Sequence, residues 1–296
     1  MIAEKPKIIV ILGQTATGKS ALVVKIALRL RSGQAPKNGG EVVSADSRQV
    51  YKGLDIGTGK ITKKEMHGIP HHMLDVVNPK YKFTVAEYKK LAEEEIRNIL
   101  KRNKTPIICG GTGFYIDTIT KGMVFPEVPP NNKLRKILEK KSELELLKIL
   151  QKLAKQRAKS IQAKNEQNNK VRLIRAIEIA KALGKVPKIT EVKPLYEFVK
   201  IGLYLPPDKL KKNIEKRVQK MFEDGLLNEI KKLKKSGVSA KRLKEFGFEY
   251  SEPNYEKVVV ETIKYAKRQM TWFKRDKEIK WFDASKKNLL RSMKVL

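Results

Sequence analysis

Residues 8–20 run Ile8-Ile9-Val10-Ile11-Leu12-Gly13-Gln14-Thr15-Ala16-Thr17-Gly18-Lys19-Ser20. The first five are apolar and predict a buried parallel strand. The next eight match the phosphate-loop pattern G-x-x-x-x-G-K-[ST], and good helix formers continue from Ala21 to Leu30. In this context, backbone N–H groups and the positive end of the helix converge on one point, where a di- or triphosphate binds. Lys19 adds a full charge there, and the Ser20 hydroxyl is placed to ligate Mg²⁺.

The N-terminal part of the chain alternates short apolar runs with helix-forming stretches, which is typical of an α/β protein with a parallel sheet. Thr84 and Glu87 form a capping box, which predicts the start of a helix. A polar, glycine-rich loop is expected at 31–40. The expected strands are 8–12, 41–45, 71–76, 105–109 and 198–205, and the expected helices are 19–30, 84–101, 115–120, one N-capped by Asp208, and 255–275.

Three prolines between Phe125 and Pro130 interrupt this alternation. From Asn132 to about Gly184 the chain is rich in Lys, Leu, Ile and Ala at helical spacing, without a strand signal. We therefore expect an α/β fold in which residues 1–122 and 198–296 form a P-loop core with a parallel sheet. A helical insertion at 123–197 interrupts that core.

The chain is strongly basic, with 65 Lys and Arg against 32 Asp and Glu and a formal net charge of +33. Such an excess favours a polyanionic partner, nucleic acid first, over the alternative of a merely charged, solvated surface. Residues 131–200 hold 19 Lys and Arg against 7 Asp and Glu, more than an even share of the excess. The helical insertion is therefore the expected contact with nucleic acid.

Several classes of protein are disfavoured. The single cysteine, Cys109, rules out an internal disulfide and is expected in the core. The histidines have no partners at the spacing of metal ligands and are expected to be structural; they are His67, His71 and His72. No apolar stretch is long enough to span a membrane, and the first residues have no signal-peptide layout. We expect a cytoplasmic protein, and nothing in the sequence requires more than a monomer.

Polar chemistry follows three of the expected strands: the phosphate loop, Asp46-Ser47-Arg48-Gln49, and Gly110-Gly111-Thr112-Gly113. Ligands of open parallel sheets bind beyond the carboxyl ends of the strands, so we expect Asp46 to face the phosphate site from a neighbouring strand. A carboxylate there is a general base, a magnesium ligand, or only the start of an Asx-turn. Thr112 either contacts a ligand or belongs to a plain strand-to-helix turn. Arg217 is one of several cations that could reach the phosphate site.

Further segments, in order, resemble one family closely, the tRNA dimethylallyltransferases, which prenylate adenosine 37 of tRNA. The resemblance covers nearly the whole chain. Its motifs are Gly13 to Ser20, Ser44 to Tyr51, Asp55 to Thr58, His71 to Val76, Gly110 to Tyr115, Arg172 to Glu178, Arg217, and Ala266 to Phe273. The loop alone is generic, whereas the combination in this order is specific.

The resemblance implies that the loop holds dimethylallyl diphosphate with Mg²⁺ and does not hydrolyse ATP. It implies that Asp46 is the general base at the adenine N6, that Thr112 lies at the reacting centre, and that Arg217 contacts the diphosphate. The insertion is similar to the helical domain that grips the tRNA anticodon stem-loop. The matching tRNA contacts are Ser47, Arg48, Gln49, Val171, Arg172, Leu173, Ile174, Arg175, Gly247, Phe248, Lys264, Lys267, Arg268 and Gln269.

The chain departs from the family pattern at three places. Gly59-Lys60-Ile61 replaces the common Ala-Lys-Pro, Gly247-Phe248-Glu249 replaces Gly-Tyr-Lys/Arg, and Thr262-Ile263 replaces Thr-Arg. These departures affect expected tRNA contacts near 248 and 263 and leave the reaction centre unchanged. From the loop and Asp46 alone, two other functions stay open: a small-molecule or nucleotide kinase that uses ATP, and a nucleotide-binding protein that binds RNA without catalysis.

Overall fold

The computed structural model describes residues 5–31, 39–287 and 289–293, so most of the loop expected at 31–40 lies outside the described residues. The chain divides into two compact units. The first consists of residues 1–122 and 193–296, and the second of 123–192. Residues 193–197, which we expected in the insertion, belong to the first unit, because Glu197 pairs with Lys7 in the sheet and the Lys5 ammonium donates to the Pro194 carbonyl at 2.8 Å.

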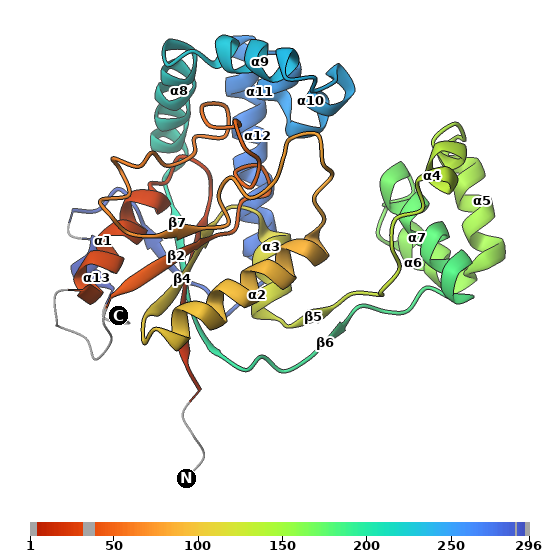
Figure 1. The fold of residues 1–296 in the computed structure, drawn as a ribbon, viewed down its shortest axis with the longest axis horizontal. Helices are drawn as coiled ribbons and strands as arrows, with labels where there is room; N and C mark the ends of the chain where they lie inside the picture. Colours follow the sequence, from red (N-terminus) through yellow and green to blue (C-terminus); the bar gives the residue numbers. More distant parts are fainter. Residues whose placement is uncertain (1–4, 32–38, 288, 294–296) are drawn as a thin grey trace. The chain divides into compact units, whose positions relative to one another are not determined.

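One parallel sheet organises the described part of the first unit (Figure 1). Its strands are β1 (Lys7–Gly13), β2 (Gly40–Ser44), β3 (His71–His72), β4 (Thr105–Gly110), β7 (Glu197–Tyr204) and β8 (Lys280–Asp283). They lie in the order β3-β2-β4-β1-β7-β8, and every pairing is parallel. The expected P-loop α/β core is therefore confirmed.

Alternate residues of β1 pack on opposite faces of the sheet, as the period of two in a strand requires. Ile9 and Ile11 pack in a cluster with α1 (Lys19–Arg31), whereas Ile8, Val10 and Leu12 pack in a cluster with α2 (Val85–Lys101) and α3 (Gly113–Thr120). Helices on both faces explain why these strands are continuously apolar. The predicted capping box before α2 is confirmed, with Thr84 and Glu87 bonded to each other's backbone N–H.

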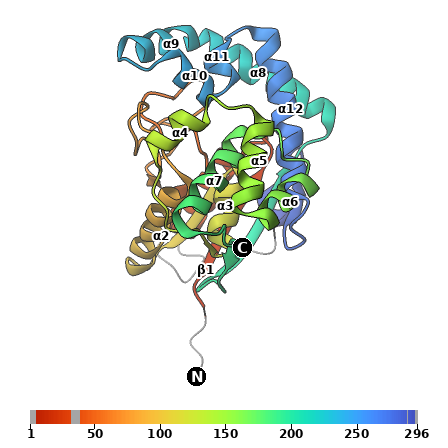
Figure 2. The ribbon, with the colours of Figure 1, turned by 90° about the vertical axis from the view of Figure 1, so that its right-hand side faces the viewer.

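The C-terminal helices are α8 (Pro207–Glu223), α9 (Leu226–Lys235), α10 (Ala240–Phe246), α11 (Phe248–Ser251), α12 (Tyr255–Phe273) and α13 (Leu289–Ser292). Figures 1 and 2 show α8 to α11 gathered beyond the carboxyl ends of the strands. Helix α12 packs against α8, where Val258 and Ala266 join Ile214 and Val218 in one apolar cluster. No helix among the described residues is both long enough and apolar enough to cross a membrane.

Three local expectations were wrong or incomplete. Helix α8 has Pro206 at its N-cap and Pro207 at its first position, where the missing N–H of proline costs nothing. Asp208 therefore lies inside the first turn and is not the N-cap residue that we expected. The strand expected at 71–76 ends at His72, because Met73 and Asp75 take positive φ angles of 63° and 55°. The short strand β8 was not predicted.

The second unit is mainly helical, as expected. Its helices are α4 (Asn132–Leu138), α5 (Glu143–Leu153), α6 (Lys155–Ala163) and α7 (Lys170–Leu183). Glu178 is buried and accepts hydrogen bonds from Arg135 at 2.8 and 2.9 Å and from the Asn131 N–H at 2.6 Å, which ties α7 to the start of α4. Two short strands not expected from the sequence, β5 (Met123–Val124) and β6 (Thr190–Glu191), pair antiparallel at the ends of the unit.

Candidate active site

The phosphate loop takes the form that its sequence predicts. A Cβ at Gly13 would lie 2.2 Å from the Leu203 carbonyl oxygen, and φ is 135° there, so only glycine fits between β1 and β7. The Gln14 carbonyl accepts from the Thr17 hydroxyl at 2.8 Å and from the Lys19 ammonium at 2.6 Å. Helix α1 begins at Lys19, which places Ser20 in its first turn.

The charges around Lys19 come from several parts of the chain. Burial lowers the pKa of Lys19 to about 8, and the nearby Arg217 acts in the same direction, while Asp46 acts in the opposite one. Asp46, which follows β2, and Arg217, which lies on α8, are therefore both close enough to Lys19 to affect its charge. Cys109, at the end of β4, is buried, and its thiol pKa is raised to about 11 by burial, in keeping with the expected core role.

Asp46 follows β2, which is not adjacent to β1, because β4 lies between them. The expectation of a neighbouring strand was wrong in this respect. The carboxylate Oδ1 accepts from the N–H of Arg48 at 2.9 Å and of Gln49 at 3.3 Å, so the Asx-turn is present. The turn uses only Oδ1 and fixes the orientation of the carboxylate, which is compatible with a base acting through Oδ2.

Thr112 connects the end of β4 to the end of β2. Its hydroxyl accepts from the Ser47 N–H at 3.0 Å and lies 3.3 Å from the Ser47 hydroxyl, while its own N–H donates to the Ala45 carbonyl at 3.2 Å. Thr112 is also the N-cap residue of α3, yet its side chain makes no capping bond to that helix. The hydroxyl is thus used to hold the Asp46-Ser47 segment in place.

Two arginines lie close to this segment. Arg48 donates to the buried Glu249 carboxylate at 2.6 Å, and its guanidinium lies over the Tyr265 ring at 5.8 Å. Arg217 donates to the Thr58 carbonyl at 2.8 Å, and burial, together with the charge of Arg48, lowers its pKa. The Gln49 amide donates to the same carbonyl at 3.3 Å. Two guanidinium groups and two carboxylates, those of Asp46 and Glu249, are therefore close together in this part of the chain.

The structure places the expected tRNA contacts very differently from one another. In the first unit, Lys264, Lys267 and Arg268 are exposed on α12, but Gln269 is buried. Gly247, with φ of 122°, joins α10 to α11, and Phe248 packs on the apolar cluster between α8 and α12.

Within the second unit, Val171 and Arg172 are exposed, and Arg172 pairs with Glu166. Leu173 and Ile174 belong to the core of that unit, so their side chains fix the position of α7. Arg175 donates to the Val128 carbonyl at 2.8 Å and pairs with Glu178. Four of these five side chains are thus engaged within the unit itself, and Val171 is the exception.

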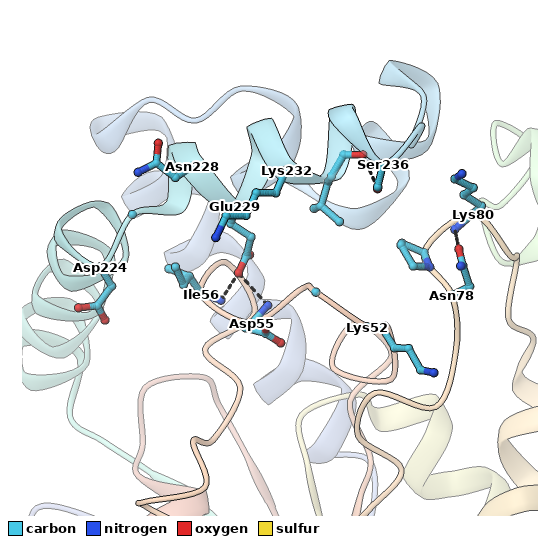
Figure 3. A pocket seen from close by; sticks show the side chains of 14 residues that line it. Lys52, Asp55, Ile56, Asn78, Lys80, Asp224, Asn228, Glu229, Lys232 and Ser236 are labelled. Carbon is cyan, nitrogen blue, oxygen red and sulfur yellow. Dashed lines mark hydrogen bonds between the residues drawn. The ribbon is translucent and has the colours of Figure 1, made fainter.

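Sequence reasoning missed Glu229, a buried carboxylate on α9. It accepts from the N–H groups of Asp55, Ile56 and Gly57 at 3.0, 2.7 and 3.1 Å and from the Tyr250 hydroxyl at 2.8 Å. Figure 3 shows it pointing from α9 towards the 55–57 loop, beside a cavity of about 630 Å³ that none of the expected site residues lines. The sequence did contain a signal for Glu229, because it is an acidic residue on the apolar face of a lysine-rich helix.

The fold and the loop sequence define a P-loop protein, and Asp46 and Arg217 act electrostatically on the lysine of its loop. The model of the family described as "IPP transferase" matches residues 49–276, and the chain belongs to this family. A tRNA dimethylallyltransferase of Halothermothrix orenii is 37% identical over 301 residues, covering 95% of this chain and 89% of the relative.

Solved structures agree with this membership. The tRNA isopentenylpyrophosphate transferase of Bacillus halodurans is 34% identical, with a TM-score of 0.67, and the match covers 99% of this chain and 94% of that one. A eukaryotic dimethylallyltransferase acting on tRNA is 28% identical, with a TM-score of 0.76, and the match covers 94% of this chain and 74% of that one.

Proposed function

We propose that this protein transfers a dimethylallyl group from dimethylallyl diphosphate to N6 of adenosine 37 in tRNA and releases diphosphate. Membership of the family supports this proposal, and one observation carries it. The carboxylate of Asp46 is fixed by its own turn within electrostatic reach of Lys19, so a base and a grip on phosphate share one site.

The chemistry follows from these positions. The N6 lone pair of adenine attacks C1 of the dimethylallyl group while the C1–O bond breaks, and the electron pair of that bond leaves with the diphosphate. Asp46 accepts the N6 proton as the new bond forms, because an amine conjugated into adenine is a weak nucleophile. Loop N–H groups, Lys19 and Arg217 stabilise the charge that develops on the leaving group.

The residues present also fit Mg²⁺. Among the described residues, no cluster of three His, Cys, Asp or Glu side chains forms a metal cage. Mg²⁺ at phosphates keeps several waters and takes few protein ligands, and the Ser20 hydroxyl in the first turn of α1 would be one of them. When bound, the ion neutralises part of the diphosphate charge.

The tRNA is proposed to bind through its backbone and through an unstacked adenine. A base reaches such a centre only after it leaves its stack. Exposed Lys264, Lys267 and Arg268 on α12 and the basic second unit supply cations for phosphates. We propose that the second unit holds the anticodon stem-loop and that the protein works in the cytoplasm as a monomer.

The decisive experiment combines purified protein, tRNA and labelled dimethylallyl diphosphate. Label on adenosine 37 supports the proposal, whereas ATP-dependent phosphorylation of a small acceptor without prenyl transfer would establish the kinase instead. Asp46→Asn should lower the rate of transfer by about 10²- to 10⁴-fold and leave tRNA affinity nearly unchanged. Asp208→Asn, which alters an exposed carboxylate in the first turn of α8, is the matched control. Normal transfer by Asp46→Asn would exclude the base role.

A further inference from the structure

Gln269 on α12 is buried, and both ends of its side-chain amide are used by loops of the site. Its Oε1 accepts from the Thr15 N–H at 2.8 Å, within the phosphate loop. Its Nε2 donates to the Gly111 carbonyl at 2.9 Å, in the turn that leads to Thr112. These bonds join parts of the chain that lie 254 and 158 residues away from Gln269.

Other contacts strengthen the same connection. The Gln14 side-chain amide donates to the Ala266 carbonyl at 3.3 Å, so two successive loop residues are tied to α12. A Cβ at Gly111 would lie 2.3 Å from Nε2 of Gln269, which shows that the turn approaches the amide closely. Ala16 also packs on the apolar cluster to which Ala266 belongs.

The chemistry of an amide suits this place. Thr15 needs an acceptor and Gly111 needs a donor, and a neutral Gln supplies both without adding charge beside a bound diphosphate. Both ends of this amide already bond to the site loops, and its burial leaves little of the side chain accessible to an RNA base or phosphate. The exposed cations on the same helix, Lys264, Lys267 and Arg268, differ from it in this respect.

We infer that Gln269 is a positioning residue that sets the phosphate loop against the Thr112 turn, and not a tRNA contact as the family resemblance implied. This inference rests on the proposed function only in taking diphosphate as the ligand of the loop. Because Gln269 acts through Thr15 and Gly111, its loss should affect the binding of diphosphate before it affects the binding of tRNA.

The test compares Gln269→Met, which keeps the volume but removes both bonds, with Lys267→Ala on the exposed face of the same helix. Affinities for inorganic diphosphate and for tRNA are measured separately, each without the other, together with KM and kcat. For Gln269→Met we expect about tenfold weaker diphosphate binding, a higher KM for the prenyl donor, and tRNA affinity within about twofold of the parent. For Lys267→Ala we expect the reverse pattern.

Weaker tRNA binding with unchanged diphosphate binding in Gln269→Met would overturn the inference. If that variant does not fold, Gln269→Glu decides, since it keeps the acceptor for Thr15 but loses the donor to Gly111 and adds a negative charge. Diphosphate affinity equal to the parent's in Gln269→Glu would then refute it. Diphosphate binding is measured without catalysis, so a failure to transfer a prenyl group would refute the proposed function and leave this result standing.

Discussion

Replacing Glu249 by Gln would measure how much the Arg48–Glu249 pair contributes to the site. The Glu249 side chain is 4% exposed and accepts from Arg48 at 2.6 Å, whereas Arg48 is 21% exposed. A hydrogen bond to a charged group contributes about 1.5–3 kcal/mol. Because water reaches part of Arg48 and replaces some of the lost interaction, we expect the free energy of unfolding to fall by about 2 kcal/mol.

Denaturant unfolding followed by tryptophan fluorescence suits this measurement, since both tryptophans, Trp272 and Trp281, lie in the first unit. Glu245→Gln is the matched control. Glu245 pairs with Arg242 at the same distance of 2.6 Å but is 35% exposed, so its loss should cost less than about 1 kcal/mol. Equal costs for the two variants, or a coupling energy with Arg48→Met below about 0.5 kcal/mol, would refute the reasoning.

Two pH dependences follow from other groups. For Lys19, kcat/KM for dimethylallyl diphosphate should fall as pH rises through about 8, because the ammonium loses its proton there. Lys19→Arg should abolish this fall. A fall that persists in the variant would contradict the assignment of the pH dependence to Lys19. At Glu41, burial alone would raise the pKa, but hydrogen bonds from Lys104, His72 and Arg102 lower it to about 2. This depressed pKa contributes roughly 3 kcal/mol of stability above pH 4.5, which is lost as pH falls from 4.5 through about 2. Glu41→Gln should flatten that part of the stability curve, and unchanged acid sensitivity would count against it.

Local patterns predicted much of the fold. The loop at 13–20, the capping box at Thr84 and the proline-rich break near 125 each depend on neighbours within a few residues, so the sequence carries them directly. The order of strands does not follow from local patterns, and β4 lies between β1 and β2 because of long-range packing.

The candidate site shows the same division. Each of the three residues Lys19, Asp46 and Thr112 follows a strand. Their position beyond the carboxyl ends of the strands was therefore predictable. The roles of Gln269 and Glu249 depend on partners more than 150 residues away in the sequence, Thr15 and Arg48. A buried polar side chain looks the same in the sequence as an exposed one, so burial had to come from the structure.

The short pairing of Met123 with Glu191 has a consequence for how the protein folds. During synthesis the whole insertion emerges before β7, so the central strand β1 lacks one of its two neighbours until then. The edge strand β8 is added last. The helical unit makes its contacts locally and so forms faster than a parallel sheet with distant partners. By holding its own two ends together, it lowers the loop-closure entropy that joining α3 to β7 would otherwise cost. An early-folding insertion therefore acts as a short bridge in the late assembly of the catalytic core.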